Sequence, residues 1–156
     1  MTQPLNNGEQ GITPAKGIEE TFRNSEEKFR SAFEYAAIRI VIANPDGRFT
    51  WANKSFITIV GYDVEEIMNI CFQDITHPDD LEIDLNYVKQ VFEGSLDYFN
   101  LEKRYIHKDG HSVWALLSAS IVRDVNGDPL HFIAQVQDIT GRKRAEEKEK
   151  TEKLIF

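Results

Sequence analysis

Apolar and polar residues recur with different periods along the chain, and each change of period predicts a new element. Apolar side chains are spaced by four and seven residues after Ile18, which is typical of one face of a helix. We therefore expect an N-terminal flanking helix at 18–37, although Asn24 or Ser25 could also cap a later start. The preceding Gly-, Pro-, Asn- and Gln-rich arm at 1–17 should be flexible.

The period shortens to two after this helix, which predicts a β-hairpin at 38–52. The turn between its strands is Asn-Pro-Asp-Gly at 44–47, with Pro and Gly at the positions that such turns favour.

The segment after this hairpin shows helical patterns. A short helix ends at Gly61, and a longer one begins at Pro78, where two following aspartates suit the positive end of the helix dipole.

The last third of the chain alternates again and predicts three strands. Lys-Asp-Gly-His at 108–111 and an Asn-Gly pair within 124–129 supply the turns between them. Two strands, several short helices and three more strands indicate the α+β class. We expect a core at 38–139 with a five-stranded antiparallel sheet, short helices on one face, and flanking helices at both ends.

The C-terminal segment 140–156 is strongly charged and predicts a separate helix. Ten of the thirteen residues from Gly141 to Lys153 are charged, and Ala145 is the one apolar residue among them. Opposite charges four residues apart, such as Arg142 and Glu146, each stabilise a helix by about 0.2–0.5 kcal/mol. An isolated helix of this kind is marginal in water, so we expect fraying without a partner.

Four short motifs occur in a fixed order. They are Asn-x-x-Phe…Gly-Tyr at 53–62, His-Pro-Asp-Asp at 77–80, x-Lys-Asp-Gly at 107–110 and Asp-Ile-Thr-x-Arg-Lys at 138–143. With their spacing, these motifs resemble the PAS domain with its C-terminal PAC segment, also called the sensory box. The resemblance runs from residue 26 to residue 147.

The resemblance implies a role in sensing or protein–protein interaction within a signalling protein. PAS domains commonly precede a histidine kinase, a diguanylate cyclase or another PAS domain, and their output runs through a helix just after Asp-Ile-Thr. The segment 140–156 then looks like a truncated connector to a missing effector, in a fragment or in an unusual stand-alone protein. We favour the sensory and dimerisation module of a histidine kinase; the alternatives are a ligand-free scaffold or the sensory domain of a diguanylate cyclase.

The fold implied by the resemblance places a cavity between the long helix and the inner face of the sheet. Strand alternation and the helical period give a largely apolar lining, in which one phenol could fix a small apolar or aromatic ligand. A filled core is the favoured alternative. The expected lining residues are Leu85, Val88, Phe92, Tyr105, Ala115, Leu117, Ala119, Ala134 and Val136.

The opposite face of the sheet would present an apolar patch of Trp114, Leu116 and Ile133. Such a patch needs cover. The apolar stripe of the N-terminal helix, with Phe22, Phe29 and Phe33, could supply it from the same chain or from a second copy. We therefore expect a homodimer.

The expected signal path runs from the inner sheet face through Asp138 and Thr140 into the C-terminal helix. Both side chains can accept hydrogen bonds from backbone N–H groups at a helix start. The simpler alternative is that the two residues only end a strand.

Flavin is not expected, although flavin-binding light sensors of this family carry a reactive cysteine. Cys71 falls one position short of that cysteine, and the accompanying Arg and Gln are absent. At the two strand positions that would hold the ring through Asn, this chain has Tyr105 and Ala115, and Val136 replaces the Gln of the final strand. Cys71 is interpreted as a small core residue.

Haem and metal sites are not expected either. The segment 81–104 contains no histidine where haem-binding members supply one. The four histidines, His77, His107, His111 and His131, look too scattered for the usual metal-ligand spacings.

Composition and motifs argue against several other functions. The net charge of −8 argues against a nucleic-acid surface, which needs a basic patch. There is a single cysteine, no signal-peptide pattern and no membrane-length apolar run, so we expect a cytoplasmic protein. No catalytic residues are expected, because no nucleophile–base arrangement or phosphate loop is present and Asp79 and Asp80 suit a helix start.

Overall fold

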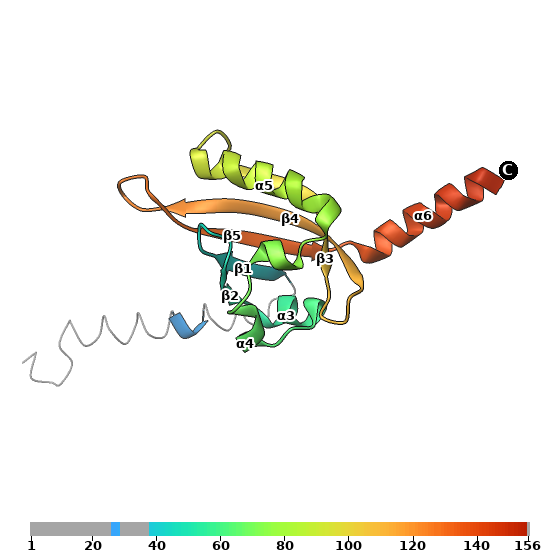
Figure 1. The fold of residues 1–156 in the computed structure, drawn as a ribbon, viewed down its shortest axis with the longest axis horizontal. Coiled ribbons are helices and arrows are strands. Elements are labelled where there is room, and N and C mark those ends of the chain that lie inside the picture. Colours follow the sequence, from blue (N-terminus) through green and yellow to red (C-terminus); the bar gives the residue numbers. More distant parts are fainter. Residues whose placement is uncertain (1–25, 29–37, 156) are drawn as a thin grey trace, which may run out of the picture.

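The fold is built on one five-stranded antiparallel sheet with the strand order β2-β1-β5-β4-β3. A computed structural model describes residues 26–28 and 38–155. The last two strands of the chain are the longest and lie side by side within the sheet (Figure 1). The strands are β1 (Arg39–Ala43), β2 (Phe49–Ala52), β3 (Tyr98–Ile106), β4 (Ser112–Arg123) and β5 (Pro129–Asp138). This architecture confirms the predicted α+β class.

Three short helices and one long helix fill the stretch between β2 and β3, and a second long helix extends away from the sheet (Figure 1). The first group is α3 (Lys54–Val60), α4 (Val64–Ile67), the 3₁₀-helix η1 (Phe72–Ile75) and α5 (Pro78–Glu93), and the extended helix is α6 (Thr140–Ile155). The arm expected at 1–17 and nearly all of the helix expected at 18–37 lie outside the described residues. Within the described part, no helix is long and apolar enough to span a membrane.

Local capping explains where these helices begin and end. The Asp63 side chain accepts a hydrogen bond from the backbone N–H of Glu66, and the Glu66 side chain accepts one from the backbone N–H of Asp63. These two bonds form a capping box for α4. Gly61 ends α3 with φ 79°, a left-handed conformation that suits glycine. Pro78 occupies the first turn of α5, directly after the cap residue His77.

A buried aromatic group fixes the short helices on the sheet. The Phe56 ring of α3 lies 5.9 Å from Phe49 and 5.4 Å from Tyr105, the second contact edge-to-face. Val60 and Ile67 are fully buried beside it. Aromatic pairs of this kind add about 0.5–1.5 kcal/mol to area burial, so this group anchors one end of the core.

Asn53 is a fully buried polar residue that joins α3 to β1. Its Oδ1 accepts from the N–H groups of Ile40 and Phe56, at 3.1 and 3.2 Å. Its Nδ2 donates to the Ile38 carbonyl at 2.8 Å. One side chain therefore caps a helix and satisfies the backbone of the neighbouring strand.

We predict that Asn53→Ala lowers the free energy of unfolding by about 2–3 kcal/mol, because it removes a cap and leaves buried backbone groups unpaired. Chemical denaturation monitored by circular dichroism measures this loss. The control is Asn86→Ala on the exposed side of α5, which should change stability by less than about 0.5 kcal/mol. Equal losses in the two variants would contradict the role given to Asn53.

Candidate functional site

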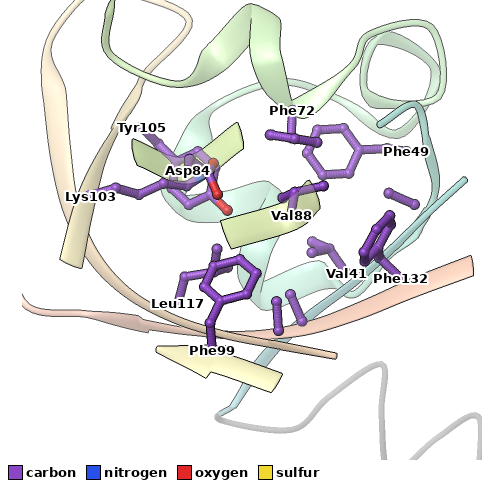
Figure 2. A pocket seen from close by; sticks show the side chains of 13 residues that line it. Val41, Phe49, Phe72, Asp84, Val88, Phe99, Lys103, Tyr105, Leu117 and Phe132 are labelled. Carbon is purple, nitrogen blue, oxygen red and sulfur yellow. The ribbon is translucent and has the colours of Figure 1, made fainter. Parts of the chain in front are cut away.

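A small cavity lies between α5 and the inner face of the sheet (Figure 2). Its volume is about 40 Å³, and since one water needs roughly 10–15 Å³, about three or four waters would fit. Figure 2 shows Asp84 and Lys103 together on one side, with Phe49, Phe72 and Phe132 on another. The lining residues are Val41, Ala43, Phe49, Phe72, Asp84, Val88, Phe99, Lys103, Tyr105, Leu117, Ala119, Phe132 and Ala134.

Five of the residues expected to line a pocket are placed around this cavity, namely Val88, Tyr105, Leu117, Ala119 and Ala134. Ala115 and Val136 are buried in the same sheet but do not reach the cavity wall. The remaining two were placed wrongly. Leu85 and Phe92 are 38% and 42% exposed and lie outside the lining.

The error concerns which face of α5 packs on the sheet. The helix buries Asp84 and Val91 and directs Val88 to the cavity, a spacing of four and three residues. Leu85 and Phe92 each follow a buried position by one residue, which rotates them by about 100° toward solvent. A reading based on apolar residues alone favoured them over Asp84, whose burial depends on a partner from another element.

That partner is Lys103 of β3. Its Nζ lies 2.6 Å from Asp84 Oδ2 and donates to Thr76 Oγ1 at 2.9 Å. The ammonium also lies 4.5 Å from the centre of the Tyr105 ring and 5.1 Å from that of Phe72. Both side chains of the ion pair are only 1% exposed, so the pair is a desolvated charge pair inside the core.

The environment of this pair sets its protonation and leaves one atom free. Burial lowers the pKa of Lys103, and the Asp84 carboxylate opposes that effect. Burial also raises the pKa of the Tyr105 phenol, which therefore stays neutral. Asp84 Oδ1 is buried and has no hydrogen-bond partner among the described residues. An acceptor thus remains available at the cavity.

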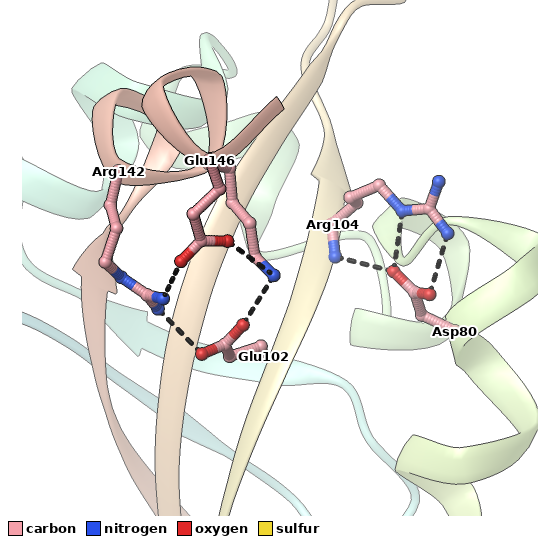
Figure 3. Close-up of polar contacts among 6 residues, drawn as sticks. Asp80, Glu102, Arg104, Arg142 and Glu146 are labelled. Atoms are coloured by element: carbon pink, nitrogen blue, oxygen red, sulfur yellow. Dashed lines mark hydrogen bonds and ion pairs between the residues drawn. The ribbon is translucent and has the colours of Figure 1, made fainter. Parts of the chain in front are cut away.

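The residue after Lys103 holds the start of α5 to the edge of the sheet. Arg104 Nε and Nη2 donate to the two oxygens of Asp80 at 2.9 and 2.8 Å, and the Arg104 backbone N–H donates at 2.8 Å (Figure 3). The Arg104 guanidinium lowers the pKa of Asp80 below its usual range. Asp80 therefore also accepts from a backbone N–H of β3 that has no neighbouring strand on that side, because β3 is an edge strand.

The residue before Lys103 binds the root of α6. Glu102 accepts from Arg142 Nη2 and pairs with Lys143 Nζ, both at 2.7 Å, while Arg142 also pairs with Glu146 at 2.8 Å (Figure 3). These contacts, led by Lys143, lower the pKa of Glu102. The first turn of α6 is therefore attached to β3.

Trp114 of β4 lies beneath this attachment. Arg104 and Lys143 place their cationic groups 4.9 and 4.6 Å from its ring centre. Its backbone N–H donates to Thr140 Oγ1 at 3.1 Å, and Asp138 Oδ1 accepts from the Thr140 N–H at 2.9 Å. The two residues expected to relay a signal thus sit at the junction of β5, β4 and α6.

The other residues proposed for packing are only partly described. Trp114, Leu116 and Ile133 are half-buried on the outer sheet face, opposite the cavity. Phe22, Phe29 and Phe33, which were expected to cover that face, lie outside the described residues. Whether they do so stays a prediction.

The cysteine and the histidines occupy separate places. Cys71 is half-buried before η1 and does not line the cavity, and burial raises the pKa of its thiol. His77 caps α5. His107 and His111 flank the predicted hairpin turn, and this β3–β4 turn stacks their rings with centres 4.4 Å apart. The judgement that the four histidines are scattered did not anticipate this contact.

We predict that removing one partner of the buried Asp84–Lys103 pair strongly lowers the free energy of unfolding, whereas replacing both partners by apolar residues lowers it much less. Lys103→Met or Asp84→Leu alone should lower the free energy of unfolding by about 3–5 kcal/mol, because an unpaired charge stays buried. The double variant should lose much less than the sum. Chemical denaturation of all four proteins gives this double-mutant cycle.

The matched control for this cycle is Lys89→Met on the exposed face of α5. Its ion pair with Glu93, at 4.0 Å, is solvent-exposed, so we expect a change below about 0.5 kcal/mol. Strictly additive losses for the Lys103 and Asp84 variants would contradict the coupling.

Comparison with known proteins identifies relatives of similar sequence and structure. The family model described as "PAS domain" matches residues 37–141. The chain is 42% identical over 123 residues to the probable diguanylate cyclase DgcE of Escherichia coli, covering 79% of this chain and 11% of that protein. It is 26% identical to the sensor histidine kinase TmoS of Ectopseudomonas mendocina, covering 79% of this chain and 13% of that protein.

A solved PAS domain from Colwellia psychrerythraea has the same fold. Its structure matches with a TM-score of 0.68 at 25% identity, over 74% of this chain and 97% of that one. The chain described here spans only a small part of the length of the two curated relatives. Together, the family match, the sheet order and the placement of the four motifs lead to one conclusion. The chain belongs to the PAS domain family.

Proposed function

We propose that this PAS domain is a sensory module that holds a small ligand in its inner cavity and reports it through α6. The observation that carries this proposal is the cavity beside a buried carboxylate oxygen that no described residue pairs. Buried polar atoms almost always have a partner. A ligand donor, or a water in its absence, would supply the partner of Asp84 Oδ1.

The lining indicates the chemical class of the ligand. Apart from Asp84, Lys103 and Tyr105, the cavity wall is apolar. A ligand with an apolar body and one hydroxyl, amide or amine donor would fit this arrangement. The 40 Å³ volume favours a compact molecule of a few heavy atoms and disfavours flavin or haem, unless α5 moves outward.

The proposed relay uses three consecutive residues of β3. Lys103 faces the cavity, whereas Glu102 and Arg104 contact the first turn of α6 and the start of α5. Successive strand residues point to opposite faces. A ligand that changes the Asp84–Lys103 contact would therefore shift the neighbours that hold α6.

We propose a cytoplasmic homodimer within a longer signalling protein. Its half-buried outer face, with Trp114, Leu116 and Ile133, is the surface that suits a second copy. The parent protein is proposed to be a sensor histidine kinase, as TmoS is described. The second candidate is a diguanylate cyclase, favoured by the 42% identity to DgcE.

We predict that Ala119→Val prevents ligand retention, because it adds two methyl groups to a cavity of about 40 Å³. Native mass spectrometry of the purified protein should show a bound small molecule in the wild type and none in this variant. The matched control is Ser120→Val, the next residue of β4 on the outer face, which should keep the ligand. The same spectrum reports the dimer.

Two results would oppose this proposal. A wild-type protein that carries only its sequence mass would favour a filled core and a scaffold role. A ligand that Ala119→Val retains as fully as the wild type would bind elsewhere.

A second prediction concerns the root of α6. Glu102→Gln removes the carboxylate charge that pairs with Arg142 and Lys143. The backbone amides of the first turns of α6 should then exchange with deuterium roughly two- to tenfold faster, since each exposed pair contributes little alone. Hydrogen exchange with mass spectrometry measures the change.

The control for this second prediction is Glu93→Gln, which also removes an exposed carboxylate but lies at the far end of α5. It should leave exchange in α6 unchanged. Unaltered protection in Glu102→Gln would show that Trp114 and Thr140 hold the helix without Glu102.

A further inference from the structure

The turn between β3 and β4 brings two imidazoles and a carboxylate together, away from the cavity. His107, Asp109 and His111 each offer one ligand atom, and these three atoms lie within 4.8 Å of one another. The two imidazole rings stack with centres 4.4 Å apart and an interplanar angle of 20°. Alternate positions of a five-residue turn therefore present their side chains to one point.

The backbone of this turn is well ordered by its own hydrogen bonds. The His107 N–H donates to the His111 carbonyl at 2.8 Å, and the Gly110 N–H donates to the His107 carbonyl at 2.8 Å. Gly110 has φ 99°, which the turn requires and glycine allows. The β3–β4 ladder continues to the pair Ile106↔Ser112. The three side chains are thus placed before any ligand arrives.

The contacts of Asp109 concentrate acceptor atoms at one point. Asp109 Oδ1 lies 3.2 Å from His107 Nδ1 and 2.5 Å from His111 Nδ1, and it also accepts from the His111 N–H. His107 Nδ1 in turn accepts from the Asp109 N–H at 3.1 Å. In that tautomer, the ring nitrogen and the carboxylate oxygen present lone pairs to each other. A cation between them would remove this repulsion.

The donor atoms lie close to the spacing that a first-row transition metal ion needs. Tetrahedral zinc with ligand distances near 2.0–2.1 Å has ligand atoms roughly 3.3 Å apart, close to the His107–Asp109 separation of 3.2 Å. The 2.5 Å contact between Asp109 Oδ1 and His111 Nδ1 is a hydrogen bond, which coordination would replace by loss of its proton and a small outward shift of the His111 ring. Two imidazoles and one carboxylate form a donor set that zinc and its neighbours accept, with water in the fourth position. The side chains of Asp109 and His111 are 62% and 55% exposed, so an ion can enter from solvent.

We propose that His107, Asp109 and His111 form a binding site for one divalent transition metal ion, with zinc as its simplest occupant. The site is separate from the ligand cavity and does not depend on the proposed sensory ligand. The surface groove that contains both histidines is also lined by Asp138, Thr140 and Arg144 at the root of α6. A bound ion would add positive charge beside this junction.

Isothermal titration of the metal-free protein with zinc chloride tests the site. The wild type should bind one zinc ion per chain. Asp109→Asn keeps an oxygen that can accept from the His111 N–H but removes the charge, and it should weaken binding about tenfold or more. His111→Ala should weaken it at least as much. The matched control is His131→Ala at the start of β5, which should bind zinc as the wild type does.

Two further readouts separate coordination from a structural role of the turn. Coordination takes the His107 lone pair that now accepts from the Asp109 N–H, so the Asp109 amide signal should shift in nitrogen-15 NMR spectra. Cobalt substitution should give the visible absorption of a four-coordinate site. Circular dichroism of each metal-free variant verifies the fold, and His111→Gln replaces His111→Ala if the latter is unfolded.

Several results would overturn the proposal. One is the absence of zinc binding at millimolar concentration in the wild type. Another is equal affinity in the wild type, Asp109→Asn and His111→Ala, which would place the ion on other acidic groups of this chain. Binding without any change of the Asp109 amide would likewise contradict coordination through His107.

Discussion

The ion pair between Asp84 and Lys103 is the constraint around which the inner face of this domain is organised. Two charges taken out of water must satisfy each other, and here Thr76 and two aromatic rings complete the surroundings of the ammonium. A buried pair adds little net stability compared with well-packed apolar residues. Its position at the wall of the cavity is what the proposed ligand role rests on, since net stability alone gives little reason to keep the pair.

The pair also lies on a strand whose neighbouring residues contact two helices. Because β3 is an edge strand, its residues reach both α5 and α6: Lys103 faces inward, and Glu102 and Arg104 contact the two helices. The contacts of Glu102 are more exposed and individually weak. The strand therefore joins a buried interaction to a solvent-exposed one, and the proposed relay uses both.

Much of the fold could be predicted because its signals are local. The cap at Asp63, the glycine at Gly61 and the proline at Pro78 each act within a few residues, and the structure has helix ends at all three places. The face of α5 that meets the sheet could not be predicted in this way. Asp84 is buried only because Lys103 arrives from a strand nineteen positions later, and apolar periodicity gives no signal for such a partner.

The histidines of the β3–β4 turn show the same limit at shorter range. The turn at 108–111 was predicted, but the four histidines were judged too scattered to form a metal site, and the stacking of the two rings that flank this turn was missed. Sequence separation predicts distance only once the backbone path is known. The features that sequence reasoning missed, Asp84 with Lys103 and His107 with His111, are polar groups brought together by β3 and by the turn that follows it. The segment from β3 through the following turn therefore carries the Lys103 charge, the attachment of α6 and the histidine pair within a few residues of each other, so a change at any one of them acts on the same edge of the sheet.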